Sequence, residues 1–248
     1  MLFHTLQFAV FFAIVFGLYL ALPHKWQNRM LLVASYVFYG AWDWRYLSLL
    51  LISTLVDFLC GLGIEGSQAR RRKKAYVAVS AIVNLSMLCT FKYFDFFAAN
   101  FQELMGQFGI TVHPYFLNVA LPIGISFYTF QTMSYTIDVY RGKVEATRNV
   151  LDFGLYVSFF PQLIAGPIER GSRLLPQVLK PRTVTLDEVL KGAYIALWGL
   201  FLKVVIADNL AKIVDPVYAP AVDYDGGMVL LATYAFAYQI YCDFAGYS

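Results

Sequence analysis

Six segments of this chain are apolar over about 20 residues each, the length that an α-helix needs to cross the hydrocarbon core of a bilayer. A shorter apolar segment at 30–41 reaches only ~18 Å at the α-helical rise. We expect it either to extend into its flanks or to thin the bilayer locally. The chain is therefore predicted to be an all-α, polytopic integral membrane protein with about seven transmembrane helices. The six longer segments are 3–22, 44–63, 75–97, 119–138, 189–208 and 228–247.

One further apolar segment, 151–168, is interrupted by Pro161, Gly166 and Pro167. Its ~18 residues are about the length of a span, but proline lacks a backbone donor and disrupts a helix. Broken backbone at membrane depth is tolerated only where protein buries it or where it lines a water-filled cavity. We therefore predict a re-entrant element that enters the membrane and returns on the same side.

The composition excludes several other classes of protein. Hydrophobic residues make up 59% of the 248 positions and charged residues only 14%, whereas a soluble domain carries about 25% charged residues. Nucleic-acid binding is a poor interpretation, because the one basic run at 70–74 lies between two apolar spans. Residues 2–22 have neither a basic flank nor a cleavage site, which favours an uncleaved first transmembrane helix. Cys60, Cys89 and Cys242 lie in apolar segments and are expected to be small buried side chains.

The positions of lysine and arginine predict an orientation. If the N-terminus is outside, 30–41 crosses and 151–168 returns on its own side, then 15 of the 19 Lys and Arg residues lie in inside loops. This agrees with the positive-inside rule, so the basic loops are predicted to face the cytoplasm. Residues 1–248 are predicted to form a single membrane domain with a cytoplasmic loop at 169–188. Within that loop, Thr185 is expected to cap the following helix together with Glu188.

A polar stripe runs along the predicted helix that contains residues 121–142. At ~100° per residue its members fall within an arc of roughly 80°. Such a stripe must face protein or a water-filled cavity. It can join neighbouring helices by hydrogen bonds, or it can line a cavity. The nearby broken segment favours the cavity. The stripe comprises Gly124, Tyr128, Gln131, Tyr135 and Asp138.

Gln162, Glu169 and Arg170 lie at or near the mouth of the broken segment. They could contact a polar substrate that enters from the cytoplasm, or they could simply mark where the chain leaves the membrane. Asp57 stands in the middle of an apolar span, where a carboxyl group needs a partner. It is expected either to be hydrogen-bonded to a neighbouring helix or to line the cavity. Asp243 is a second carboxyl group in a span.

The three histidines lie outside the apolar spans, at His4, His24 and His113. Each is read as a solvated surface residue and not as a general base. No Ser-His-Asp arrangement, phosphate-binding loop or metal-ligand spacing is visible, so no metal site is predicted.

Five blocks of residues, in order along the chain, resemble the membrane-bound O-acyltransferase family, in its branch of alginate O-acetyltransferases and D-alanyl-transfer proteins. The likeness runs along the whole chain. The blocks are Ala34-Ser-Tyr-Val-Phe-Tyr-Gly40, Leu121-Pro-Ile-Gly-Ile-Ser-Phe-Tyr-Thr-Phe-Gln131, Ile137-Asp-Val-Tyr-Arg-Gly142, Phe159-Phe-Pro-Gln-Leu-Ile-Ala-Gly-Pro-Ile168 and Tyr241-Cys-Asp-Phe-Ala-Gly-Tyr-Ser248.

The resemblance implies a multi-pass enzyme of the bacterial cytoplasmic (inner) membrane, with a central tunnel. Through it an acyl group would pass from a cytoplasmic donor, acetyl-coenzyme A or a derivative, with no covalently bound cofactor. The implied partners are the lipid bilayer, periplasmic or membrane-anchored acetyltransferases, and an exopolysaccharide acceptor such as alginate. Tyr128, Gln131, Tyr135, Asp138, Gln162, Glu169 and Arg170 are the candidate tunnel-lining or substrate-binding residues.

The chain departs from the family pattern in one respect. The family's catalytic histidine, which would serve as general base, lies in a membrane helix beyond the block that ends at Ser248. No catalytic residue is therefore assigned within the chain. It is expected to be the N-terminal half of a larger enzyme and to be inactive alone. A membrane transporter and an inactive scaffold that recruits an acetyltransferase are the alternative interpretations.

Overall fold

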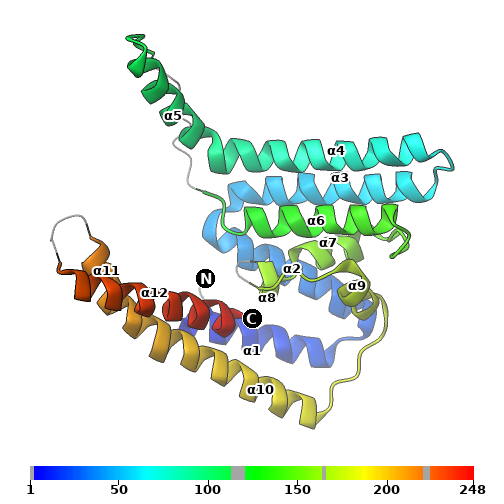
Figure 1. Ribbon diagram of the computed structural model, residues 1–248. Coiled ribbons are helices and arrows are strands. Elements are labelled where there is room, and N and C mark those ends of the chain that lie inside the picture. Colours follow the sequence, from blue (N-terminus) through cyan, green and yellow to red (C-terminus); the bar gives the residue numbers. More distant parts are fainter. Residues whose placement is uncertain (1–2, 113–120, 164–165, 220–223) are drawn as a thin grey trace. The chain divides into compact units, whose positions relative to one another are not determined.

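The computed structural model describes residues 3–112, 121–163, 166–219 and 224–248, and every regular element in these ranges is a helix (Figure 1). The all-α class predicted above is confirmed. Four helical runs are long and apolar enough to cross a membrane, at His24–Glu65, Arg70–Gln107, Leu186–Tyr218 and Gly226–Tyr247, and Leu6–Ala21 is a shorter apolar helix. The α-helices are α1 (Leu6–Ala21), α2 (His24–Asp43), α3 (Leu47–Glu65), α4 (Arg70–Leu88), α5 (Phe94–Gln107), α6 (Ile125–Tyr140), α7 (Val150–Ser158), α8 (Phe160–Leu163), α9 (Gly171–Leu179), α10 (Leu186–Leu200), α11 (Asp208–Tyr218) and α12 (Gly226–Tyr247).

The helices form two compact units, which are described separately. One unit contains α1 and the helices α10, α11 and α12, and the other contains α2 to α9. Three short helices of other types interrupt the long runs. They are the 3₁₀-helix η1 (Trp44–Tyr46) and the π-helices η2 (Cys89–Tyr93) and η3 (Phe201–Ala207).

The short apolar segment at 30–41 lies inside the 20-residue helix α2. It therefore extends into both flanks, which was one of the two predicted outcomes. At η1 the chain turns between α2 and α3, and Asp43 caps this turn by accepting a hydrogen bond from the Arg45 amide at 3.0 Å. The Arg45 guanidinium lies 2.6 Å from the same carboxylate and lowers the pKa of Asp43 below its usual value.

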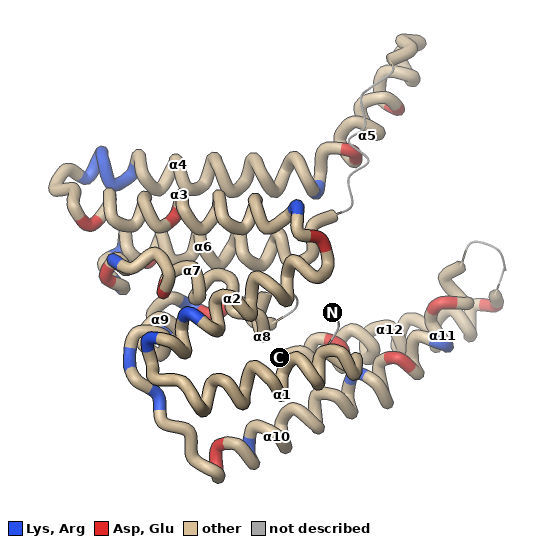
Figure 2. Tube along the Cα trace, turned by 180° about the vertical axis from the view of Figure 1, so that it is seen from behind, with Lys and Arg blue, Asp and Glu red and all other residues tan. Residues whose placement is uncertain are grey.

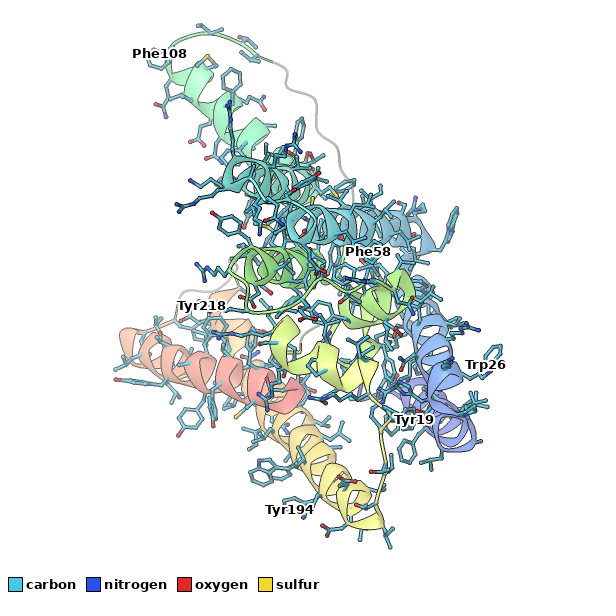
Figure 3. The ribbon with its side chains drawn as sticks, turned by 90° about the vertical axis from the view of Figure 1, so that its right-hand side faces the viewer. Tyr19, Trp26, Phe58, Phe108, Tyr194 and Tyr218 are labelled. Carbon is cyan, nitrogen blue, oxygen red and sulfur yellow. The ribbon has the colours of Figure 1, made fainter. Side chains whose placement is uncertain are left out.

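The larger unit is built around helices α3, α4 and α6, which pack side by side (Figure 1). Its core is rich in aromatic side chains. Phe58 on α3, labelled in Figure 3, lies with its ring centroid 6.0 Å from that of Phe153 on α7. Phe153 in turn lies 4.5 Å from Tyr135 on α6, and the Phe153 and Tyr135 side chains are fully buried. This aromatic core brings α7, from the broken segment, against the polar stripe of α6.

The polar stretch between the broken segment and α10 is partly helical. Its helix α9 buries Leu175 and Val178. Near the beginning of α2, Asn28 donates a hydrogen bond to the Val178 carbonyl at 2.9 Å and to Asp152 at 3.0 Å. The predicted capping of α10 is confirmed, because Thr185 and Glu188 form the full capping box. The amide and hydroxyl of Thr185 lower the pKa of the Glu188 carboxyl by hydrogen bonding to it.

In the smaller unit, α10 and η3 cross α12 at two glycines. A Cβ atom at Gly199 would lie 2.5 Å from the Gly246 carbonyl oxygen, and one at Gly246 would lie 2.7 Å from the Gly199 carbonyl oxygen. Only glycine allows two backbones to approach so closely, as small residues do where membrane helices meet. This contact positions the last of the five sequence blocks, 241–248, against η3.

Candidate functional site

The broken segment consists of two short helices separated by one residue. Helix α7 ends at Ser158, Phe159 has an extended backbone (φ −52°, ψ 111°), and α8 covers only Phe160–Leu163. Pro161 falls in the first turn of α8, where a missing backbone donor costs least. The break predicted from the prolines is therefore confirmed in the described residues. Residues 164 and 165 lie outside them.

Side chains from other helices satisfy the backbone groups that this break exposes. In a continuous helix the Tyr156 carbonyl would accept from the Phe160 amide. Here that carbonyl accepts from the Gln131 amide group at 2.7 Å and from the Gln162 amide group at 2.9 Å. The Phe160 amide donates instead to the Ser35 hydroxyl of α2 at 3.2 Å. Non-helical backbone within a membrane protein requires such partners.

Three of the predicted site residues thus lie around the break and are buried in the core. Gln131 and Gln162 both donate a hydrogen bond to the Tyr156 carbonyl oxygen, and they are 3% and 7% exposed. Tyr135 is fully buried, and its hydroxyl accepts a hydrogen bond from the Thr147 amide at 2.9 Å. The contacts of these three residues hold backbone segments together. Whether they also contact a substrate stays a prediction.

The other three polar candidates are less enclosed. Asp138 and Glu169 are half-buried, and Arg170 is exposed and precedes α9. The Glu169 carbonyl accepts a hydrogen bond from the Tyr156 hydroxyl at 3.2 Å. In the described part of the chain, the side chains of Asp138, Glu169 and Arg170 make no hydrogen bond.

Tyr128 differs from the rest of the stripe because its hydroxyl is buried without a well-aligned hydrogen bond. It lies beside the Tyr39 hydroxyl of α2, which is in the same situation, and the neighbouring Thr129 hydroxyl makes no hydrogen bond with the described residues. Buried hydroxyl groups normally have a partner, and each exception needs an explanation. The first two sequence blocks, 34–40 and 121–131, meet at this pair of tyrosines.

Asp57 is held in a buried network between three helices. Its carboxylate accepts hydrogen bonds from Thr136 on α6 at 2.5 Å, from Asn84 on α4 at 2.6 Å, and from Ser80 on α4. Ser53 and Thr132 extend the network by contacting the Asn84 side-chain oxygen at 2.6 and 3.5 Å. Of the two roles predicted for Asp57, the structure shows the hydrogen-bonded one.

A second polar cluster, in the smaller unit, was not predicted from the sequence. The Lys203 ammonium group in η3 lies 2.8 Å from a carboxylate oxygen of Asp208 and 2.8 Å from one of Asp243 on α12. The Lys203 side chain is only 17% exposed. Charged residues within membrane segments are costly unless they are paired, and π-helical turns are frequent at functional sites. The sequence feature that could have indicated this cluster is the presence of a lysine and two aspartates in apolar spans. Their pairing, however, depends on how η3 and α12 cross.

Removing Lys203 should therefore affect stability through Asp243. We expect Lys203→Met to destabilise the protein more in the native background than together with Asp243→Asn, with a coupling energy of about 1–3 kcal/mol. Thermal unfolding of the four proteins in detergent measures this coupling. Lys191→Met is a matched control, because the Lys191–Asp187 ion pair is exposed and is expected to contribute little. Equal losses in both backgrounds would contradict the pairing.

The remaining titratable candidates do not assemble into a recognisable centre. Across the described ranges, no group of three or more His, Cys, Asp or Glu side chains could hold a metal ion. His4 is exposed, whereas His24 is half-buried and its Nε2 lies 3.3 Å from the Leu179 carbonyl oxygen. His113 lies outside the described residues. Cys60 and Cys242 are buried as predicted, but Cys89 is exposed.

Comparison with known proteins gives a consistent result. Several similar proteins carry the name "probable alginate O-acetylase AlgI". The one from Azotobacter vinelandii is 39% identical over 241 residues, covering 96% of this chain and 48% of the relative. The one from Pseudomonas aeruginosa is 39% identical over 241 residues, covering 96% and 46%. A peptidoglycan O-acetyltransferase of Helicobacter pylori is 33% identical over 251 residues, covering 91% and 46%.

The chain thus spans about half the length of the curated relatives it matches. No family model and no solved structure matches it. The likeness to these relatives covers nearly the whole chain. This likeness agrees with the resemblance of the five sequence blocks to the membrane-bound O-acyltransferase family.

Proposed function

We propose that this chain is part of a membrane-bound O-acyltransferase that transfers acetyl groups for the O-acetylation of an exopolysaccharide such as alginate. The observation that carries the proposal is the 39% identity over 96% of the chain to proteins named as alginate O-acetylases. The broken helix supports it, because it provides non-helical backbone within the membrane unit, where polar groups can face a substrate.

The proposed acyl donor is acetyl-coenzyme A or a derivative on the cytoplasmic side. The proposed partners are periplasmic or membrane-anchored acetyltransferases that act on the polysaccharide. The chain would lie in the bacterial inner membrane with its N-terminus outside. The basic run at the beginning of α4 supports this orientation, because it lies at one end of the helices of the larger unit (Figure 2), and basic loops favour the cytoplasm.

Within this function, the predicted residues receive different roles. Gln131, Tyr135 and Gln162 would maintain the shape of the broken helix through the contacts described above. Tyr128, with Tyr39, would present buried hydroxyl groups to the acyl path, since neither has a well-aligned partner. Asp138, Glu169 and Arg170 would contact the polar donor at the cytoplasmic mouth. The general base would be the family's histidine, which the resemblance implies to lie after the last sequence block.

The experiment uses the whole protein in sealed vesicles, with its native partners and an exopolysaccharide acceptor. Acetyl-coenzyme A labelled in the acetyl group is supplied on the side of the basic loops. We expect labelled acetyl esters on the polysaccharide, detected after removal of free donor and lost upon mild alkaline hydrolysis.

The same vesicles distinguish the alternatives. Intact labelled coenzyme A thioester inside the vesicles without any ester would support a transporter. The Tyr128→Trp variant is designed to block the acyl path while the membrane protein stays present. If esters still form with this variant, the result would support a scaffold. Either result would contradict the proposed function.

A further inference from the structure

Helix α5 differs from the other long helices because none of its residues is buried in the described structure. It follows the membrane helix α4 through the π-helix η2, and in Figure 1 it bends away from α4 at that point. Sharp bends in helices commonly occur at π-helical turns. The helix therefore changes direction where the membrane segment ends, and it presents all its faces outside the bundle.

The position of this bend relative to the bilayer follows from the length of α4. The basic run that begins α4 ends at Lys74. A hydrocarbon core ~30 Å thick takes about 20 residues of helix at 1.5 Å each, which places its other boundary near Phe94. Lys92 and Tyr93 lie just before this point, and Asp95 lies just after it. Lysine and tyrosine are typical of the membrane–water interface.

Four large apolar residues of α5 and the residue that follows it, Phe108, share one side. At ~100° per residue they fall within an arc of roughly 80°, and each is at least 40% exposed. Most polar residues lie on the opposite side, together with Phe96. The apolar residues are Phe94, Phe97, Phe101, Leu104 and Phe108, and the polar ones are Asp95, Asn100, Gln102, Glu103 and Gln107. Figure 3 shows Phe108 at the far tip of the helix.

If α5 continued straight along α4, its 14 residues would rise ~21 Å into water, and the large apolar side chains of this side would stay unburied. If it turns into the plane of the membrane, the same side chains enter the headgroup and acyl-chain boundary. An amphipathic helix binds in this way through its apolar side. Lipid is therefore the expected partner of the apolar side. Helix α5 continues from the membrane helix α4 through η2, which holds the beginning of α5 at the membrane surface.

We propose that α5 lies flat in the lipid–water interface, with the side formed by Phe94, Phe97, Phe101, Leu104 and Phe108 buried in lipid. The helix then holds the end of α4 at a fixed depth. Through the hydrogen bond from Lys92 to Ser126 at 3.2 Å, it also holds the beginning of α6, next to the second sequence block. This inference concerns only the membrane interaction and stands independently of the acyltransferase proposal.

Spin labels on the two sides of α5 test it. In the whole protein, with its native cysteines replaced by alanine and reconstituted in lipid nanodiscs, Phe101→Cys and Glu103→Cys are labelled separately. These positions lie on opposite sides of the helix. The ratio of collisions with oxygen to collisions with a water-soluble nickel chelate should be several-fold higher at 101 than at 103. Phe97→Cys and Gln102→Cys form a second matched pair, in case a variant of the first pair does not fold.

Two outcomes would overturn the proposal. High nickel accessibility at both positions of a pair would place α5 in water. Low accessibility to both reagents at 101 and 97 would show that protein covers the apolar side, either another part of the same protein or a partner. Folding of each labelled variant is checked by a single symmetrical peak in gel filtration.

Discussion

The Asp57→Leu substitution is expected to lower the free energy of unfolding by about 3 kcal/mol or more. It removes the acceptor for three buried donors, on Ser80, Asn84 and Thr136, and each buried donor left unpaired costs about 1–3 kcal/mol. Asp57 itself has no exposed surface, so water cannot replace it. Because the donors come from α4 and α6, the loss should loosen the packing of both helices against α3.

Equilibrium unfolding of the variants in detergent measures this effect. Asp57→Asn keeps one acceptor oxygen and should be affected less than Asp57→Leu. Leu59→Ala is the matched control, since Leu59 lies on the same helix and is 55% exposed. If Asp57→Leu is as stable as this control, the network does not hold the three helices together.

The second large effect is expected where the helix breaks. Gln131 and Gln162 both donate to the Tyr156 carbonyl, so either single change to leucine leaves one partner in place. The double change leaves a buried carbonyl with no side-chain donor, at a cost of about 1–3 kcal/mol. We therefore expect the double variant to lose more stability than the sum of the single variants, and to lose acetyl transfer if the proposed function holds.

A double-mutant cycle tests this, since neighbouring residues that share one partner show a coupling energy. Gln177→Leu is a suitable control, because Gln177 is exposed and, among the described residues, its side chain bonds only to the Arg173 carbonyl of its own helix. Simple addition of the two single effects would show that the amides do not replace each other on the Tyr156 carbonyl. Normal acetyl transfer by a folded double variant would show that the two amide contacts are not needed for transfer.

Features that depend on neighbouring residues could be predicted from the sequence. The spanning segments follow from runs of apolar residues, and the break at 151–168 follows from two prolines. The capping box of Thr185 and Glu188 follows from two residues three positions apart. The extension of 30–41 into a 20-residue helix was one of the two outcomes that the thickness of a bilayer allowed.

The role of the polar stripe on α6 could not be predicted from the sequence. Its residues share one side of the helix, as the period of the α-helix requires. The structure gives them different surroundings, since Gln131 and Tyr135 bond to backbone groups of distant segments while Tyr128 lies beside Tyr39. Whether this side joins helices or lines a path could not follow from periodicity, because both need the same residue types.

The sequence by itself therefore determined that this chain is a helical membrane protein, where its main apolar segments lie, and which side of the helix within 121–142 is polar. Only the tertiary structure decided the partners of the polar groups. Asp57 meets Thr136 across 79 positions of sequence, Phe160 meets Ser35 across 125, and Lys203 meets Asp243 where η3 crosses α12. Such contacts depend on how the helices are rotated and how closely they pack, and these are set by the shapes of all the side chains between them.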